Sequence, residues 1–145
     1  MLNIKICSEA IDINKFISDF NNTAHGAVLF FFGNVRSTNN DLVVNGIKYD
    51  AHVPLAEKII NDICDEAKLK HDSGIDISII HRIGELNVGE ASVAIGVSSM
   101  HREEAFRASK YIIDELKLRV PIWKEEHYVD GKKEWLDGNQ LTENK

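Results

Sequence analysis

Three groups of basic and polar residues stand at positions where a folded domain has no obvious need of them. The first is Ser98-Ser99-Met100-His101-Arg102, where an expected strand gives way to an expected helix. Backbone N–H groups at a helix N-terminus attract anions, and a hydroxyl, an imidazole and a guanidinium flank them here. At about 100° per residue, Arg102 shares its direction with Phe106 and Val120, which predicts that it points to the packed side of the helix. Alternatively, Arg102 pairs with a carboxylate or snorkels at the helix end.

The second group is Gly33-Asn34-Val35-Arg36, where a nearly all-apolar strand ends in a glycine. Arg36 is the first charged residue after that strand. Loops at strand ends commonly present binding residues, so Arg36 is a candidate for anion recognition. A solvated loop arginine is the other interpretation.

The third group is Lys117, Pro121 and Lys124. Lys117 lies within about 40° of the apolar centre line of its expected helix, and Lys124 follows Trp123 in the next expected strand. Lysines at an apolar border often snorkel to water. A partly desolvated lysine beside other cations, however, loses proton affinity and becomes a usable base or nucleophile near neutral pH.

Alternating and helical segments must position these groups. Period-two alternation or compact apolar runs predict strands at 2–7, 26–33, 43–52, 75–83, 90–98, 122–128 and 132–136. Helical spacing predicts helices at 13–20, 54–70 and 100–119. The expected apolar stripe of the second helix consists of Leu55, Ile59, Ile63 and Ala67, joined by Ile60. That of the third consists of Phe106, Ser109, Ile113, Leu116 and Val120, widened by Ala105 and Ile112. This order predicts an α+β fold, with an antiparallel or mixed β-sheet, packed helices and a C-terminal β-hairpin turning at Asp130-Gly131.

Length and charge restrict the classes of protein that this chain can represent. Its 145 residues suit one domain, 1–137, followed by a polar C-terminal tail, 138–145. With 23 acidic against 17 basic residues the net charge is -6, which argues against nucleic acid as a partner. No apolar stretch approaches the roughly 20 residues that span a bilayer, and the N-terminus lacks the order of a secretory signal. We therefore expect a cytoplasmic protein with no membrane partner.

Cysteine and histidine spacing gives no metal motif. Cys7 and Cys64 lie outside any Cys-x-x-Cys pair, so they are expected to be small buried apolar residues. The histidines without metal-type spacing, each expected at the surface or hydrogen-bonded in the core, are His25, His52, His71, His81 and His127. The carboxylates Asp62, Asp65 and Glu66 are expected on the solvated face of the second helix.

Four motifs in order resemble the MoaE family, the large catalytic subunits of molybdopterin synthase, from about residue 26 to residue 135. They are Gly33-Asn34-Val35-Arg36, His81-Arg82-Ile83-Gly84-Glu85-Leu86-Asn87-Val88-Gly89-Glu90, Ser98-Ser99-Met100-His101-Arg102-Glu103-Glu104-Ala105-Phe106 and Leu116-Lys117-Leu118-Arg119-Val120-Pro121-Ile122-Trp123-Lys124-Glu125-Glu126. The resemblance implies an α/β hammerhead fold and a homodimer. Each copy would bind one small ubiquitin-like, MoaD-like sulfur carrier, giving a heterotetramer.

The resemblance also implies the reaction and the residues that perform it. Two sulfurs pass in turn from the carrier's C-terminal thiocarboxylate to cyclic pyranopterin monophosphate, forming the dithiolene of molybdopterin, with no metal and no cofactor. The implied roles are pterin and phosphate binding by Arg36, His101 and Arg102, proton transfer and electrostatics beside the thiocarboxylate by Lys117 and Lys124, and lining of the pocket by Asn34, Val35, Glu125 and Glu126. Gathered in one site, the five cations would focus positive potential on a phosphate and a thiocarboxylate.

One feature departs from the family pattern. Family members often carry an arginine a few residues past the position of Trp135, whereas no arginine occurs here beyond Arg119. The competing hypothesis is a non-catalytic anion-binding or adaptor domain of the same fold, and the presence of both Lys117 and Lys124 argues against it.

Overall fold

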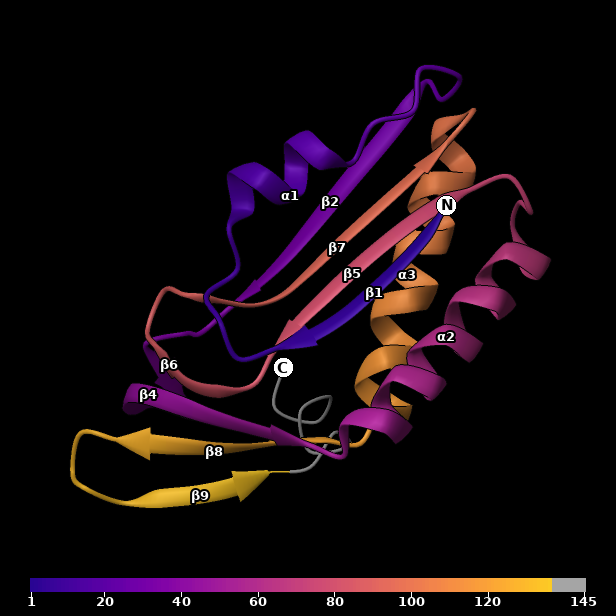
Figure 1. Cartoon of the computed structure of the whole chain (residues 1–145). Coiled ribbons are helices and arrows are strands. Elements are labelled where there is room, and N and C mark those ends of the chain that lie inside the picture. Colours follow the sequence, from indigo (N-terminus) through magenta and orange to yellow (C-terminus); the bar gives the residue numbers. More distant parts are fainter. Residues whose placement is uncertain (137–145) are drawn as a thin grey trace.

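The chain folds into two β-sheets joined at an angle, with three helices packed around the larger sheet (Figure 1). We describe residues 1–136 of a computed structural model. The helices are α1 (Ile13–Asp19), α2 (Val53–Lys70) and α3 (Arg102–Arg119). The strands are β1 (Leu2–Cys7), β2 (Ala27–Asn34), β3 (Thr38–Asn39), β4 (Leu42–Ala51), β5 (Asp76–Arg82), β6 (Gly84–Asn87), β7 (Ala91–Ser99), β8 (Ile122–Tyr128) and β9 (Lys133–Leu136).

The larger sheet has the strand order β1-β5-β7-β2, with β1 parallel to β5 and the other pairs antiparallel. Helices α2 and α3 cover one face of this sheet, and the short helix α1 lies on the other (Figure 1). Between the sheet and α2 and α3 lies the main core, where Ile79 packs with Ile60 and Ile112. Beneath α1, the ring of Phe16 meets that of Phe30 edge-on. The predicted α+β fold with a mixed sheet is confirmed.

The second sheet has the strand order β3-β4-β8-β9, with β6 also paired to β4. Its β8-β9 pair is the predicted C-terminal hairpin, and Gly131 takes the positive φ of 87° that the turn requires. Strand β6 lies between the strands predicted at 75–83 and 90–98, in a segment that we expected to be the loop between them. Gly84, with a φ of 93°, redirects the chain after β5, so that residues 84–87 can pair with β4.

The buried faces of the helices keep most of the predicted stripe residues but exclude Leu55 and Phe106. Helix α3 buries Ala105, Ala108, Ile112 and Leu116, whereas Phe106 is 61% exposed. Helix α2 likewise buries Ala56, Ile60, Ile63, Cys64 and Ala67, and leaves Leu55 exposed. Alanines bring a helix closer to its neighbours than a phenylalanine or leucine would, so the small residues face the sheet. The predicted inward direction of Arg102 is therefore wrong, and its side chain is exposed.

The predicted polar tail, 138–145, and its boundary at residue 137 lie outside the described residues. Within residues 1–136, no helix combines the length and apolar character needed to cross a bilayer. Both cysteines are free thiols, but only Cys64 is buried as predicted, whereas Cys7 is half-buried. Burial raises the pKa of Cys64 to about 12, which makes this thiol inert.

Candidate functional site

A cavity of about 310 Å³ lies where the C-terminal end of α3 meets both sheets. Its cationic lining residues are Arg36, Lys117 and Lys124, and its neutral polar ones are Asn34, Tyr49, His81 and Ser92. The remaining wall consists of Phe31, Gly33, Val93, Leu116, Val120 and Ile122. A cavity with several cations and an apolar wall suits a ligand that combines anionic groups with a flat or extended apolar body.

Three separate elements bring the cations to this cavity. Arg36 follows the end of β2, just beyond an irregularity in the β2-β7 pairing at Gly33 and Asn34. Lys117 lies in the last turn of α3, and Lys124 lies on β8, directly opposite Tyr49 of β4. Since α3 ends at Arg119 and β8 begins at Ile122, the short connection through Pro121 keeps the two lysines near one another.

Lys124 and Glu126 form a buried ion pair at the edge of the cavity. The Lys124 Nζ lies 2.9 Å from Oε1 of Glu126, and Glu126 is only 1% exposed. Asn39 Nδ2 and the Tyr128 hydroxyl donate to the other carboxylate oxygen, at 2.7 and 2.8 Å. Burial alone would raise the pKa of Glu126, but hydrogen bonds from Lys124 and Asn39 outweigh burial and hold this pKa below its usual value. The carboxylate therefore stays ionised and holds the ammonium of Lys124 in place.

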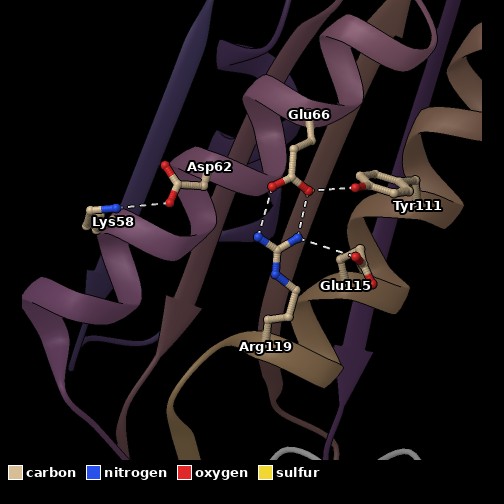
Figure 2. A network of polar contacts seen from close by, with 6 residues as sticks. All are labelled: Lys58, Asp62, Glu66, Tyr111, Glu115 and Arg119. Atoms are coloured by element: carbon tan, nitrogen blue, oxygen red, sulfur yellow. Dashed lines mark hydrogen bonds and ion pairs between the residues drawn. The ribbon is translucent and has the colours of Figure 1, made fainter.

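A second polar network fixes the last turn of α3 against α2 (Figure 2). The Arg119 guanidinium donates to both carboxylate oxygens of Glu66, at 2.6 and 2.9 Å, and the Tyr111 hydroxyl donates to the same carboxylate at 2.6 Å. Hydrogen bonds from Arg119 and then Tyr111 lower the pKa of Glu66 to about 2. Since Lys117 belongs to the same turn as Arg119, this network also restricts the position of Lys117.

Comparison with known proteins shows the family of this chain. The model of the family described as MoaE protein matches residues 6–119. The chain belongs to the MoaE family. It is 44% identical over 119 residues to the molybdopterin synthase catalytic subunit of Synechococcus elongatus, covering 82% of this chain and 72% of that protein. It is 39% identical over 133 residues to the protein of the same name from Staphylococcus aureus, covering 92% and 89%.

The fold of a solved relative agrees with this assignment. The crystal structure of molybdopterin synthase from Staphylococcus aureus superposes with a TM-score of 0.83 at 38% identity, covering 90% of this chain and 94% of that one. The MoaE resemblance stated from sequence motifs is thus confirmed, and the predicted fold class is that of the family.

In this MoaE chain, His101 and Arg102 do not reach the cavity that holds the other three cations. They lie at the opposite end of α3, roughly 22 Å from Lys117 along the helix axis at 1.5 Å per residue. There they line a separate hollow together with Gly26 and Phe106. The expectation that one chain gathers five cations into one site is therefore not met. The helix predicted at 100–119 already implies this separation, because each helical residue advances the chain by about 1.5 Å.

Three further residues of the predicted set, Val35, Glu125 and Glu126, do not line the cavity itself. Val35 lies between Asn34 and Arg36 but is buried in the hydrophobic core. Glu125 lies on the opposite face of β8 from Lys124, because neighbouring strand residues alternate. There its carboxylate meets Nε2 of His127 at 2.6 Å. Glu126, by contrast, lines a small hollow beside the cavity.

Three polar residues of the cavity were missed by the sequence reasoning: Tyr49, His81 and Ser92. His81 was expected to be a surface or core histidine because it lacks metal-type spacing. Its position at the start of the second MoaE motif could have indicated a role in the site. Within residues 1–136, no three His, Cys, Asp or Glu side chains come together to hold a metal ion.

Proposed function

We propose that this chain is the catalytic subunit of a molybdopterin synthase, which transfers two sulfurs from a carrier thiocarboxylate to cyclic pyranopterin monophosphate. The observation that carries this proposal is the convergence of Arg36, Lys117 and Lys124 on one partly apolar cavity in a MoaE family chain. A guanidinium can bind phosphate through two parallel hydrogen bonds, so we assign the phosphate group of the precursor to Arg36. The lysines then face the thiocarboxylate.

The chemistry of each transfer suits these side chains. The thiocarboxylate sulfur forms a bond to a precursor carbon, and the oxygen on that carbon leaves, as water in one transfer and as an oxygen of the opened cyclic phosphate in the other. Water then cleaves the bond between this sulfur and the carrier's carbonyl carbon, so that the carrier ends as a carboxylate. Both steps need protons delivered to oxygen and stabilisation of negative charge, which Lys117 and Lys124 can supply. No cofactor enters this scheme.

His101 and Arg102 enter this proposal through a second copy of the chain. If they contact the same substrate as Arg36, the separation along α3 requires that the partner protomer supplies them. A homodimer, joined by one small ubiquitin-like carrier per copy in a heterotetramer, meets this requirement. Analytical ultracentrifugation at micromolar concentration should show dimers, and a sample of monomers alone would contradict this part of the proposal.

The compartment we propose is the cytoplasm. The two cysteines are free thiols, as is usual in a reducing compartment. Fractionation of cells should recover the chain with the cytosolic proteins.

Reconstitution tests the proposed activity against the non-catalytic alternative. Purified chain is mixed with thiocarboxylated carrier and the pyranopterin precursor, and molybdopterin is quantified. The proposed function requires molybdopterin with more than one turnover per chain. A non-catalytic adaptor would bind carrier or anion, but the mixture would yield no molybdopterin above that formed without the chain.

A further inference from the structure

We propose that His81 is a further substrate-binding residue of the cavity, whose Nε2 accepts a hydrogen bond from an N–H or O–H group of the bound pterin. This inference rests on the proposed function, because it takes the pyranopterin as the ligand. It is carried by the position of His81 in the cavity wall and by the hydrogen bond that its other ring nitrogen makes.

The local contacts determine which ring nitrogen carries the proton. The Nδ1 of His81 lies 2.9 Å from the carbonyl oxygen of Arg82. A carbonyl oxygen only accepts, so Nδ1 must hold a hydrogen and donate it. The ring of Tyr49 packs edge-on against the imidazole of His81, with 5.3 Å between the ring centroids. This contact holds the imidazole in its orientation. In the neutral ring, Nε2 is then left with a lone pair.

The surroundings keep this imidazole neutral. His81 is only 6% exposed, and burial lowers its pKa to about 4. Arg36, Lys117 and Lys124 line the same cavity, and their positive charge also disfavours an imidazolium. Near neutral pH, Nε2 therefore accepts hydrogen bonds and does not donate them.

An acceptor of this kind complements the rest of the lining. Arg36 and the two lysines can only donate, so a donor group of the ligand needs an acceptor from another lining residue. A pterin ring carries N–H donors as well as acceptors. Arg36 then binds the phosphate, the two lysines face the thiocarboxylate, and His81 accepts a hydrogen bond from a donor group of the heterocycle.

Two variants separate this role from a structural one. His81→Asn keeps an amide N–H near the position of Nδ1, so it can still bond the Arg82 carbonyl, but it has no acceptor at the position of Nε2. His81→Gln places its amide near Nε2 and loses the bond to the carbonyl. Precursor affinity is measured by calorimetry on each purified protein without carrier. Carrier affinity and thermal stability are measured beside it.

The proposal expects His81→Asn to weaken precursor binding roughly 5- to 30-fold, the effect of leaving one buried hydrogen-bonding group unsatisfied. His81→Gln should stay within about 3-fold of wild type, because its amide oxygen can accept from the same donor. Carrier affinity should be unchanged in both variants. The opposite order, equal losses in both variants, or no loss in either overturns the inference.

A measurement on the wild-type protein keeps the test independent of folding defects in the variants. With ¹⁵N-labelled histidine, the Nε2 resonance of His81 should be that of an unprotonated nitrogen and should shift when precursor is added to saturation. A protonated Nε2 or an unchanged resonance overturns the inference. Precursor binding by wild type with an unperturbed His81 refutes this inference alone. Failure of wild type to bind precursor refutes the proposed function as well.

Discussion

Lys124 and Glu126, two residues apart on β8, form an ion pair 2.9 Å long in which both side chains are almost completely buried. Alternate residues of a strand share a face, so both project to the cavity side of the sheet. Asn39 and Tyr128 also donate to the Glu126 carboxylate. A lysine that lines a binding cavity is thus held by a carboxylate that is itself fully hydrogen-bonded.

Replacing Glu126 should therefore damage stability as well as activity. Glu126→Gln leaves the buried ammonium of Lys124 without its counter-charge, and breaking one side of a buried pair costs about 3 to 5 kcal/mol of unfolding free energy. Urea denaturation at pH 7 measures this loss. The matched control is Glu125→Gln, whose partly exposed pair with His127 lies on the other face and should contribute less than about 1 kcal/mol. Equal losses in the two variants would contradict the assigned role of the buried pair.

The cavity lysines should be required for sulfur transfer. Lys117→Ala and Lys124→Ala should each slow single-turnover formation of molybdopterin by at least roughly 100-fold, the effect of losing a positioned acid or base. Lys117→Arg should also be poorly active, because a guanidinium keeps the charge but does not release a proton. Lys48→Ala, on an exposed part of β4, is the control and should react at the wild-type rate. Near wild-type rates for the cavity variants would mean that neither lysine takes part in sulfur transfer.

The separation of Arg36 from Arg102 predicts complementation between subunits. Arg36→Ala and Arg102→Ala should each weaken precursor binding by about 1.5 to 3 kcal/mol, as expected for hydrogen bonds to charged groups. If one site uses Arg36 of one protomer and Arg102 of the other, mixed dimers of the two variants contain one intact site. Random exchange of subunits should then restore about a quarter of the wild-type sites. Titration of precursor into the re-equilibrated mixture counts these sites, and no recovery would contradict shared sites.

The ion pair between Glu66 and Arg119 predicts how stability depends on pH. Folding lowers the pKa of Glu66 from about 4.5 to about 2, so its stabilising effect is complete above the unfolded value and is lost as the pH falls through this interval. Glu66→Gln should lower the melting temperature at pH 7, and the difference from wild type should shrink between pH 4.5 and pH 2. Glu57→Gln, an exposed position on the same helix, should show no such trend. A difference that is constant with pH would contradict the role of the Glu66 charge.

The sequence by itself determined the elements that depend on local backbone preferences. Asp12 caps α1 through its bond to the Lys15 N–H, α3 ends just before Pro121, and Gly131 turns the final hairpin. These preferences act within a few residues, so they can be predicted without knowing the rest of the fold. The MoaE motifs likewise identified Arg36, Lys117 and Lys124, since a motif is a local string of residues.

Only the tertiary structure decided how distant segments share surfaces. It placed the small residues of α3 against the sheet and left Phe106 exposed, because packing distance and not hydrophobicity alone determines the buried face. It brought Arg36 and Lys117 from separate elements to one cavity, and it paired Asn39 with Glu126 across 87 residues of chain. Strand pairing and helix docking bring such residues together or hold them apart, and no local periodicity encodes these long-range contacts.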